Sequence, residues 1–167
     1  MRTLIAIIPL LLVSVAISQK PQPEAGMYVD QQGALAKLET APHPNVQAKS
    51  KFVKETVSWV FRGAQAAAQF STSRPNFVLY GSSERFVIVQ LDRKSDHREL
   101  QVASGSMFGG HGGWDEKRTT LTLASKRQDG GLDLSPEKDL EPGEYLITTE
   151  TAPRQAYDFG IQPEPKQ

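Results

Sequence analysis

The segment DLEPGEYLITTE, residues 139–150, decides the fold class of this chain. Proline fixes φ at about −65° and glycine accepts a positive φ, so Pro142 and Gly143 predict a type II turn. Beyond the turn, large apolar and β-branched residues alternate with period two from Tyr145 to Thr149, a pattern typical of a half-buried strand. The segment therefore predicts a sharp turn that leads directly into a β-strand.

A tyrosine soon after such a turn resembles the tyrosine corner of Greek-key sandwiches. In that feature the phenol hydroxyl donates a hydrogen bond to backbone a few residues upstream. The resemblance implies this structural role for Tyr145 and says nothing about function. The alternative is an ordinary strand tyrosine, with its ring in the core and its hydroxyl in water.

Period-two patterns recur along the rest of the chain. RFVIVQL, residues 85–91, has apolar residues on both faces, which predicts a central strand covered on both sides. AQAAAQF, residues 64–70, is interpreted as a narrow-faced strand, and its alanines leave a helix open as the alternative. Further strands are expected at 26–30, 33–39, 56–61, 77–80, 99–103, 119–124, 132–134 and 157–161. Residues 40–50 and 104–117 are expected to be loops, and residues 135–137 a single helical turn.

About nine or ten short strands at this spacing predict an all-β fold. We expect an antiparallel β-sandwich of the Ig-like or a related Greek-key type, with a small barrel as the alternative. The domain is expected to span residues 26–161, after a flexible lead at 19–25 and before a disordered tail at 162–167. Amphipathic segments long enough for the helices of a layered α/β fold are absent from the sequence.

The first 18 residues predict a secretory signal peptide. Arg2 gives a positive start, an apolar run extends from Leu4 to Val15, and small residues precede a cleavage site after Ser18. Such a run is too short for a membrane span, so the mature chain is expected to have no transmembrane segment. The alternative is an uncleaved N-terminal anchor. The protein is therefore expected to be secreted or periplasmic.

The composition narrows the expected location and the expected partners of the protein. The chain has no cysteine and no Asn-x-Ser/Thr sequence, which fits a bacterial periplasm or exterior better than a eukaryotic secretory route. It carries 19 Lys and Arg residues against 19 Asp and Glu residues. This balance gives no electrostatic reason to expect nucleic acid or an anionic membrane as a partner.

The glycine-rich segment at 104–117 is the candidate ligand-binding loop, with Phe108, His111 and Trp114 as its candidate residues. It combines an imidazole, aromatic rings and glycines that adopt unusual backbone angles. The sequence His-Gly-Gly-Trp is similar to the oxyanion-hole segment of lipases and esterases. The third glycine and the Gly-x-Ser-x-Gly elbow of those enzymes are missing, and the alternative is a connection packed on the body by its aromatic residues.

No other pattern indicates catalysis. His43, His97 and His111 lack metal-ligand spacing, so neither a metal nor a cofactor is predicted. We therefore expect a non-catalytic β-sandwich module that binds a protein or an envelope component. The alternative is a small hydrolase or metal-dependent enzyme centred on His111.

Three short segments together resemble uncharacterised secreted bacterial β-domains. They are Gly-x-Tyr at 26–28, Arg-Gly-Ala at 62–64 and Leu-x-Pro-Gly-Glu-Tyr at 140–145. The resemblance implies a fold and no activity.

Overall fold

The computed structural model describes residues 23–31, 34–51, 54–106, 109–113, 115–149 and 155–163. Within these ranges the protein is all-β, with one short 3-10 turn, η1 (Glu116–Arg118), and no α-helix. The strands are β1 (Gly26–Gln31), β2 (Ala34–Lys37), β3 (Asn45–Lys51), β4 (Lys54–Arg62), β5 (Gln69–Phe70), β6 (Phe77–Tyr80), β7 (Phe86–Arg93), β8 (His97–Ser106), β9 (Gly109–Gly112), β10 (Thr119–Lys126), β11 (Leu132–Pro136), β12 (Gly143–Thr149) and β13 (Ala156–Ile161).

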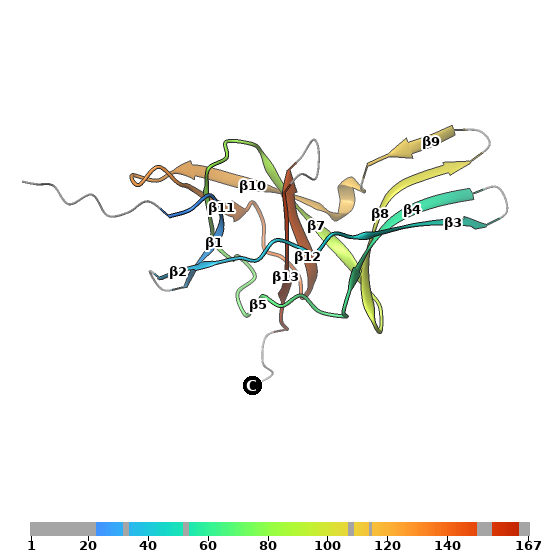
Figure 1. Ribbon diagram of the computed structural model, residues 1–167, viewed down its shortest axis with the longest axis horizontal. Coiled ribbons are helices and arrows are strands. Elements are labelled where there is room, and N and C mark those ends of the chain that lie inside the picture. The colour runs from blue at the N-terminus through green and yellow to red at the C-terminus, as the bar shows by residue number, and fades with distance from the viewer. Residues whose placement is uncertain are drawn as a thin grey trace, which may run out of the picture.

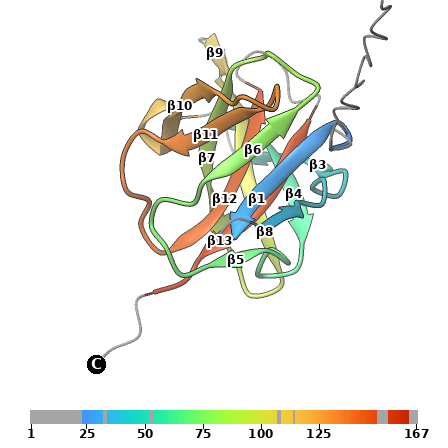
Figure 2. The same ribbon diagram turned by 90° about the vertical axis from the view of Figure 1, so that its left-hand side faces the viewer.

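These strands form three parts of one curled, open sheet that makes a half-barrel. The outer sheet has the order β2-β1-β6-β11-β10, and the central sheet has the order β10-β7-β12-β13-β5. Figure 2 shows the outer sheet in front of the central one. The third part, β3-β4-β8-β9, is called the arm, and it extends away from the other two (Figure 1).

Two strands connect the three parts. Residues 119–121 of β10 pair with β7, whereas residues 122–126 pair with β11, so β10 passes from the central to the outer sheet. The end of β7 pairs with the start of β8, where Asp92 lies opposite Glu99. The sheet therefore bends at β10 on one side and at β7 on the other.

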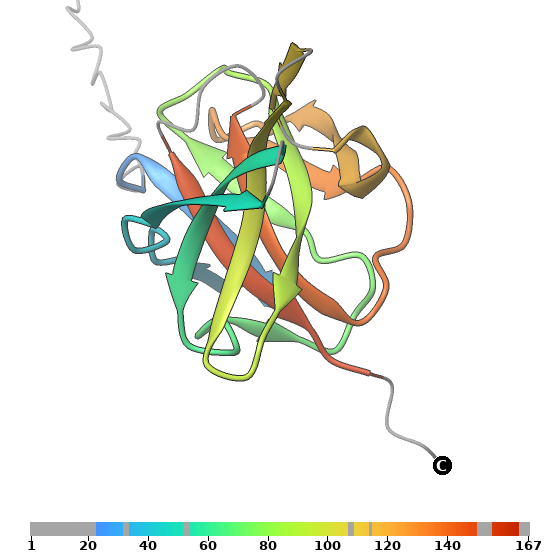
Figure 3. The same ribbon diagram turned by 90° about the vertical axis from the view of Figure 1, so that its right-hand side faces the viewer.

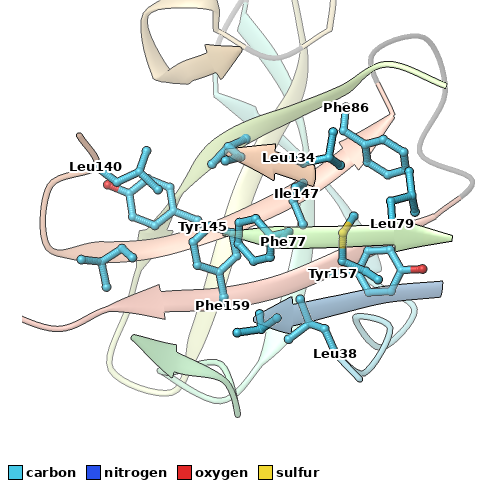
Figure 4. Packing of buried hydrophobic residues seen from close by; sticks show 14 residues of the cluster. Leu38, Phe77, Leu79, Phe86, Leu134, Leu140, Tyr145, Ile147, Tyr157 and Phe159 are labelled. Carbon is cyan, nitrogen blue, oxygen red and sulfur yellow. The ribbon is translucent and has the colours of Figure 1, made fainter. Parts of the chain in front are cut away.

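The main core lies between the outer and central sheets (Figure 4). Phe159 is fully buried at its centre, with its ring 5.1 Å from that of Phe77 and stacked at 5.6 Å from that of Tyr145. The other buried members are Met27, Val29, Leu38, Leu79, Phe86, Ile88, Leu134, Leu140, Ile147, Tyr157 and Ile161. Burial of this much apolar surface is the main term that stabilises the fold.

A second core lies on the opposite face of the central sheet, beneath the arm. Val87, Val89 and Leu91 of β7 pack there with Leu146 of β12 and with Phe61 and Leu100 of the arm. Figure 3 shows the arm strands crossing in front of the central sheet. The prediction that residues 85–91 form a central strand buried on both faces is confirmed.

The hydrogen bond expected of Tyr145 is present, but the predicted turn is wrong. The Tyr145 hydroxyl donates to the backbone oxygen of Glu141 at 2.7 Å. Gly143 has no positive φ; it is the first residue of β12 and pairs with Ile161. A side chain there would lie 3.2 Å from the Gln90 amide and in ordinary contact with the tyrosine ring, so glycine eases close packing there and does not form the predicted turn. The strand is also buried on both faces rather than half-buried.

The same local arrangement occurs at the start of β1. Tyr28 donates its hydroxyl hydrogen to the backbone oxygen of Glu24 at 3.0 Å, again four residues upstream. Both sites have the sequence Glu-x-Gly-x-Tyr. One strand of the outer sheet and one strand of the central sheet therefore begin with the same hydrogen bond, although Gly26 has a positive φ of 149° and Gly143 does not.

Replacing Tyr145 by Phe is expected to change the alkaline limb of the stability curve. Burial, and then the nearby Glu141 charge, raise the pKa of Tyr145 from 10 to about 12. The unfolded chain therefore loses this proton first, and stability falls as pH rises from 10 to 12. In the Phe variant, the fall in the free energy of unfolding between pH 10 and 12 should be smaller by about 2–3 kcal/mol. At neutral pH the variant should be less stable by about 1 kcal/mol, because it lacks the hydrogen bond. Urea unfolding at pH 7 to 11.5 measures both effects, and an unchanged alkaline limb contradicts the prediction.

Besides the segment at 104–117, three expected elements differ from those observed. Residues 45–50, expected as loop, belong to β3, a fully exposed strand whose apolar alternation is too weak to identify it. Of residues 64–70 only Gln69 and Phe70 form a strand, because the Ala66 amide donates instead to the Glu144 carboxylate at 2.7 Å. Residues 135 and 136 end β11 rather than beginning a helical turn.

Several expectations concern parts of the chain outside the described residues. These are the signal peptide at 1–18, most of the lead at 19–25 and most of the tail at 162–167. Among the residues that are described, no helix is long and apolar enough to cross a membrane.

Candidate functional site

The arm presents a face of apolar and small residues that leads out of the second core. Trp59, half-buried against that core, lies opposite Leu100 on one side and Val46 on the other. Farther along the arm, Val57 of β4 lies opposite Ala48 of β3. Val46 is 66% exposed. The arm therefore continues the apolar surface of the core into solvent.

A β-bulge marks the place where the arm leaves the body. Ser58 pairs with Gln101 and Val57 with Ala103, so Val102 is an extra residue in β8. Such an insertion bends a strand and increases its twist. Val102 still packs partly on the second core, and the strands beyond it extend past the body (Figure 1).

Arg98 holds the base of the arm on the central sheet. Its side chain is 2% exposed. Nη1 donates to Asp158 of β13 at 2.5 Å, Nη2 to the oxygen of Arg62 at 3.2 Å, and Nε to the oxygen of Gly63 at 3.1 Å. A buried charge is tolerated only when it is paired and hydrogen-bonded in this way. One side chain thus connects β8, the end of β4 and β13.

A second buried carboxylate completes this cluster. Glu144 of β12 is 3% exposed, and its Oε2 lies 3.9 Å from Nη1 of Arg98. The same oxygen accepts the Ala66 amide hydrogen, while Oε1 accepts from Gln69 at 3.3 Å. The Gln69 amide lies where a side chain at position 160 would be, so any other residue there would displace Gln69 from Glu144. The cluster fixes the segment after β4 against the central sheet.

The glycine-rich segment expected to be a loop is largely a β-hairpin. Ser104 pairs with His111 and Gly105 with Gly110, so β9 folds back along β8. Glycines at facing positions let the two backbones approach closely, since a side chain at Gly110 would meet Gly105 at 3.3 Å. The loop interpretation was wrong because backbone pairing needs no apolar side chains.

The structure places only one of the three candidate loop residues. The backbone of His111 belongs to β9, and its side chain lies outside the described part of the structure. Phe108 and Trp114 also lie outside it. Whether the three side chains meet therefore remains a prediction, as does the enzyme centred on His111.

A cleft of about 660 Å³ opens where β9 returns to the body. Charged and polar residues from β7, β8 and η1 line it together with residues at the end of β9: Asp92, Leu100, Gln101, Ser104, Gly112, Gly113, Asp115, Glu116, Lys117 and Arg118. A smaller cavity of about 250 Å³ shares Lys117 and Arg118 with it and reaches Tyr145. The base of the arm and the start of β12 thus border one polar region.

Hydrogen bonds order the charged wall of this cleft. Arg118 donates to Asp92 at 2.7 Å, and that bond holds the pKa of the Asp92 carboxyl below its usual range. Asp115 caps η1, its Oδ1 accepting from the amide of Lys117 at 2.9 Å. With Asp92 and Arg118 paired, Asp115, Glu116 and Lys117 give the wall an excess of one negative charge. It can accept hydrogen bonds and attract a cation.

The described residues contain no group of three His, Asp or Glu side chains that could hold a metal ion. His97 lies at the start of β8, with Nδ1 2.7 Å from Asp96.

Arg98, the buried charged residue that connects the arm to the central sheet, was not identified from the sequence. The sequence does contain an indication of this burial. Arg98, Leu100 and Val102 are spaced by two residues, so in a strand they lie on the same face, and that face points to the core.

Comparisons with known proteins add no assignment. No family model matches the chain, and no curated protein or solved structure matches it.

Proposed function

We propose that this protein is a non-catalytic extracytoplasmic module that binds a protein or an envelope component through its arm. The observation that carries the proposal is the apolar face of the arm, which continues from the second core into solvent and includes the exposed Val46. Every residue of β3 from 45 to 50 is exposed as well. Apolar residues at the centre of a polar surface are typical of protein-binding sites.

The proposed cellular location rests on the predicted signal peptide. Residues 1–18 have the charge, apolar run and small residues of a secretory signal peptide, which supports a secreted or periplasmic protein. The absence of cysteine agrees with a chain that needs no disulfide framework. For the architecture, two facing sheets over one core support the sandwich of the Ig-like or Greek-key type that we propose.

Replacing Val46 by Asp is expected to reduce capture of the partner about tenfold in a crosslinked pull-down from envelope fractions, because a charge would enter an apolar contact. The matched control is Leu123→Asp on β10, where the leucine is 56% exposed but lies in the outer sheet, opposite Ser135, and not in the arm. This control should capture the partner as well as the unchanged chain does.

Two results would count against the proposal. If the unchanged chain enriches no partner, the protein is not a binding module of this kind. If Leu123→Asp loses capture while Val46→Asp keeps it, binding occurs on β10 and the arm is only structural. Circular dichroism of both variants confirms that each is folded before it is compared.

A further inference from the structure

The inference concerns the free edge of β9. Among the described residues β9 pairs only with β8, so its other edge has no strand beside it. The Gly113 amide donates to the Val102 oxygen at 2.8 Å. Because backbone groups alternate in direction along an antiparallel pair, His111 bonds to Ser104 across the hairpin. Gly110 and Gly112 therefore direct both their N–H and their C=O groups away from β8.

This edge is open to another backbone. Gly110 and Gly112 are exposed, and a side chain at Gly112 would meet nothing within 4 Å. The β3 edge of the arm carries Lys49, which reaches Glu99 at 3.3 Å, and the β2 edge carries Lys37. Lysines and similar charges are the usual protection against added strands, and the described sequence of β9 has none.

The cleft continues from the same edge. Gly112 and Gly113 form part of its wall, with Asp115 and Glu116 beside them. A strand that adds antiparallel to β9 runs from the body toward the far end of the arm, so its N-terminal end would enter the cleft. The excess negative charge there would attract a lysine or arginine at that end of the strand.

We propose that β9 binds an extended polypeptide segment of a partner protein as an added antiparallel strand. The main chain of the segment bonds to Gly110 and Gly112, and a basic residue at its N-terminal end lies in the cleft near Glu116. Main-chain bonds supply affinity in this mode of recognition, and side-chain pockets supply selectivity. This inference rests on the proposed function and names the kind of partner that the arm takes.

The test uses a displayed library of random linear peptides, selected on the full chain, and then the best synthetic peptides in solution. Gly112→Pro removes the outward donor without removing a bond of the hairpin, and we expect it to weaken the selected peptides about tenfold. The control is Lys37→Pro, which by the same alternation removes an outward donor from the β2 edge, outside the arm. It should leave peptide affinity unchanged.

A second measurement leaves the protein unaltered. N-methylation of the peptide amides along one edge should abolish binding, while methylation along the other edge should not, since only one edge faces β9. Glu116→Gln should weaken peptides with an N-terminal lysine or arginine and make their affinity less sensitive to salt. If no peptide is enriched, if methylation at every position is tolerated, or if Gly112→Pro binds as the unchanged chain does, strand addition is wrong.

The two proposals fail in different ways. A partner that both the unchanged chain and Gly112→Pro capture equally from envelope fractions leaves the binding function intact and removes strand addition. Failure of the unchanged chain to capture any partner removes the proposed function itself.

Discussion

Replacing Arg98 by Met is expected to lower the free energy of unfolding by about 3–5 kcal/mol. The substitution keeps most of the side-chain volume and removes the charge. Asp158 and Glu144 then stay in the interior without their cation, and the oxygens of Arg62 and Gly63 lose their donor. Urea unfolding followed by tryptophan fluorescence measures the change.

Arg93→Met is the matched control. Arg93 lies directly opposite Arg98 across the β7–β8 pair, yet its side chain is exposed. Its loss should change stability by no more than about 0.5 kcal/mol. A cost below about 1 kcal/mol for Arg98→Met contradicts the prediction and means that the two carboxylates do not depend on this guanidinium.

Leu134→Ala is expected to be the second large effect, at about 3 kcal/mol. Leu134 is 1% exposed in the main core between the two sheets, where its loss removes apolar contacts and leaves a cavity. The midpoint of urea unfolding should fall with no change in its slope, because the surface exposed on unfolding stays nearly the same.

Leu123→Ala makes the same chemical change on the neighbouring strand. Leu123 lies opposite Ser135, one residue from Leu134 in the β11 register, but on the face that points to solvent. Its replacement should cost no more than about 0.5 kcal/mol. Equal effects of the two substitutions would show that Leu123 is buried and that the assigned faces of β10 are wrong.

The sequence predicted strands well where apolar residues alternate strongly. The strands around Ile88, Tyr145 and Phe159 are confirmed because each carries large side chains at period two. β3 and β9 were missed because their residues are polar or glycine and are held by backbone pairing alone. Period two identifies a strand only when at least one of its faces is buried.

Alternation also leaves open which face is inward. Thr119, Leu121 and Leu123 do share a face, but Leu121 and Leu123 are exposed while Thr120 is buried. The cause is the passage of β10 between two sheets, which a local pattern cannot reveal.

The repeated Glu-x-Gly-x-Tyr start of β1 and β12 was visible in the sequence, but its meaning depends on a hydrogen bond four residues upstream.

For the candidate site, the segment at 104–117 stays a prediction as a binding region, and its predicted form as a loop was wrong. A side chain at Gly112 would meet nothing within 4 Å, so this part of the β9 edge is uncovered by the described residues. The pairing of the β9 glycines with β8 is a local hairpin, but the cleft beside them also needs Asp92 of β7, which is distant in the sequence. The roles of the other predicted residues, Phe108 and Trp114, remain predictions.

The position of β7 has a consequence for the order of folding. Its two neighbours in the central sheet, β10 and β12, both follow it in the chain, and β12 ends at Thr149. This strand, which is buried on both faces, therefore cannot acquire both neighbours until the chain has been made as far as Thr149. Folding dominated by such distant pairings is slow, on the order of milliseconds to seconds. If the chain is exported as we propose, that delay keeps it unfolded long enough to be translocated.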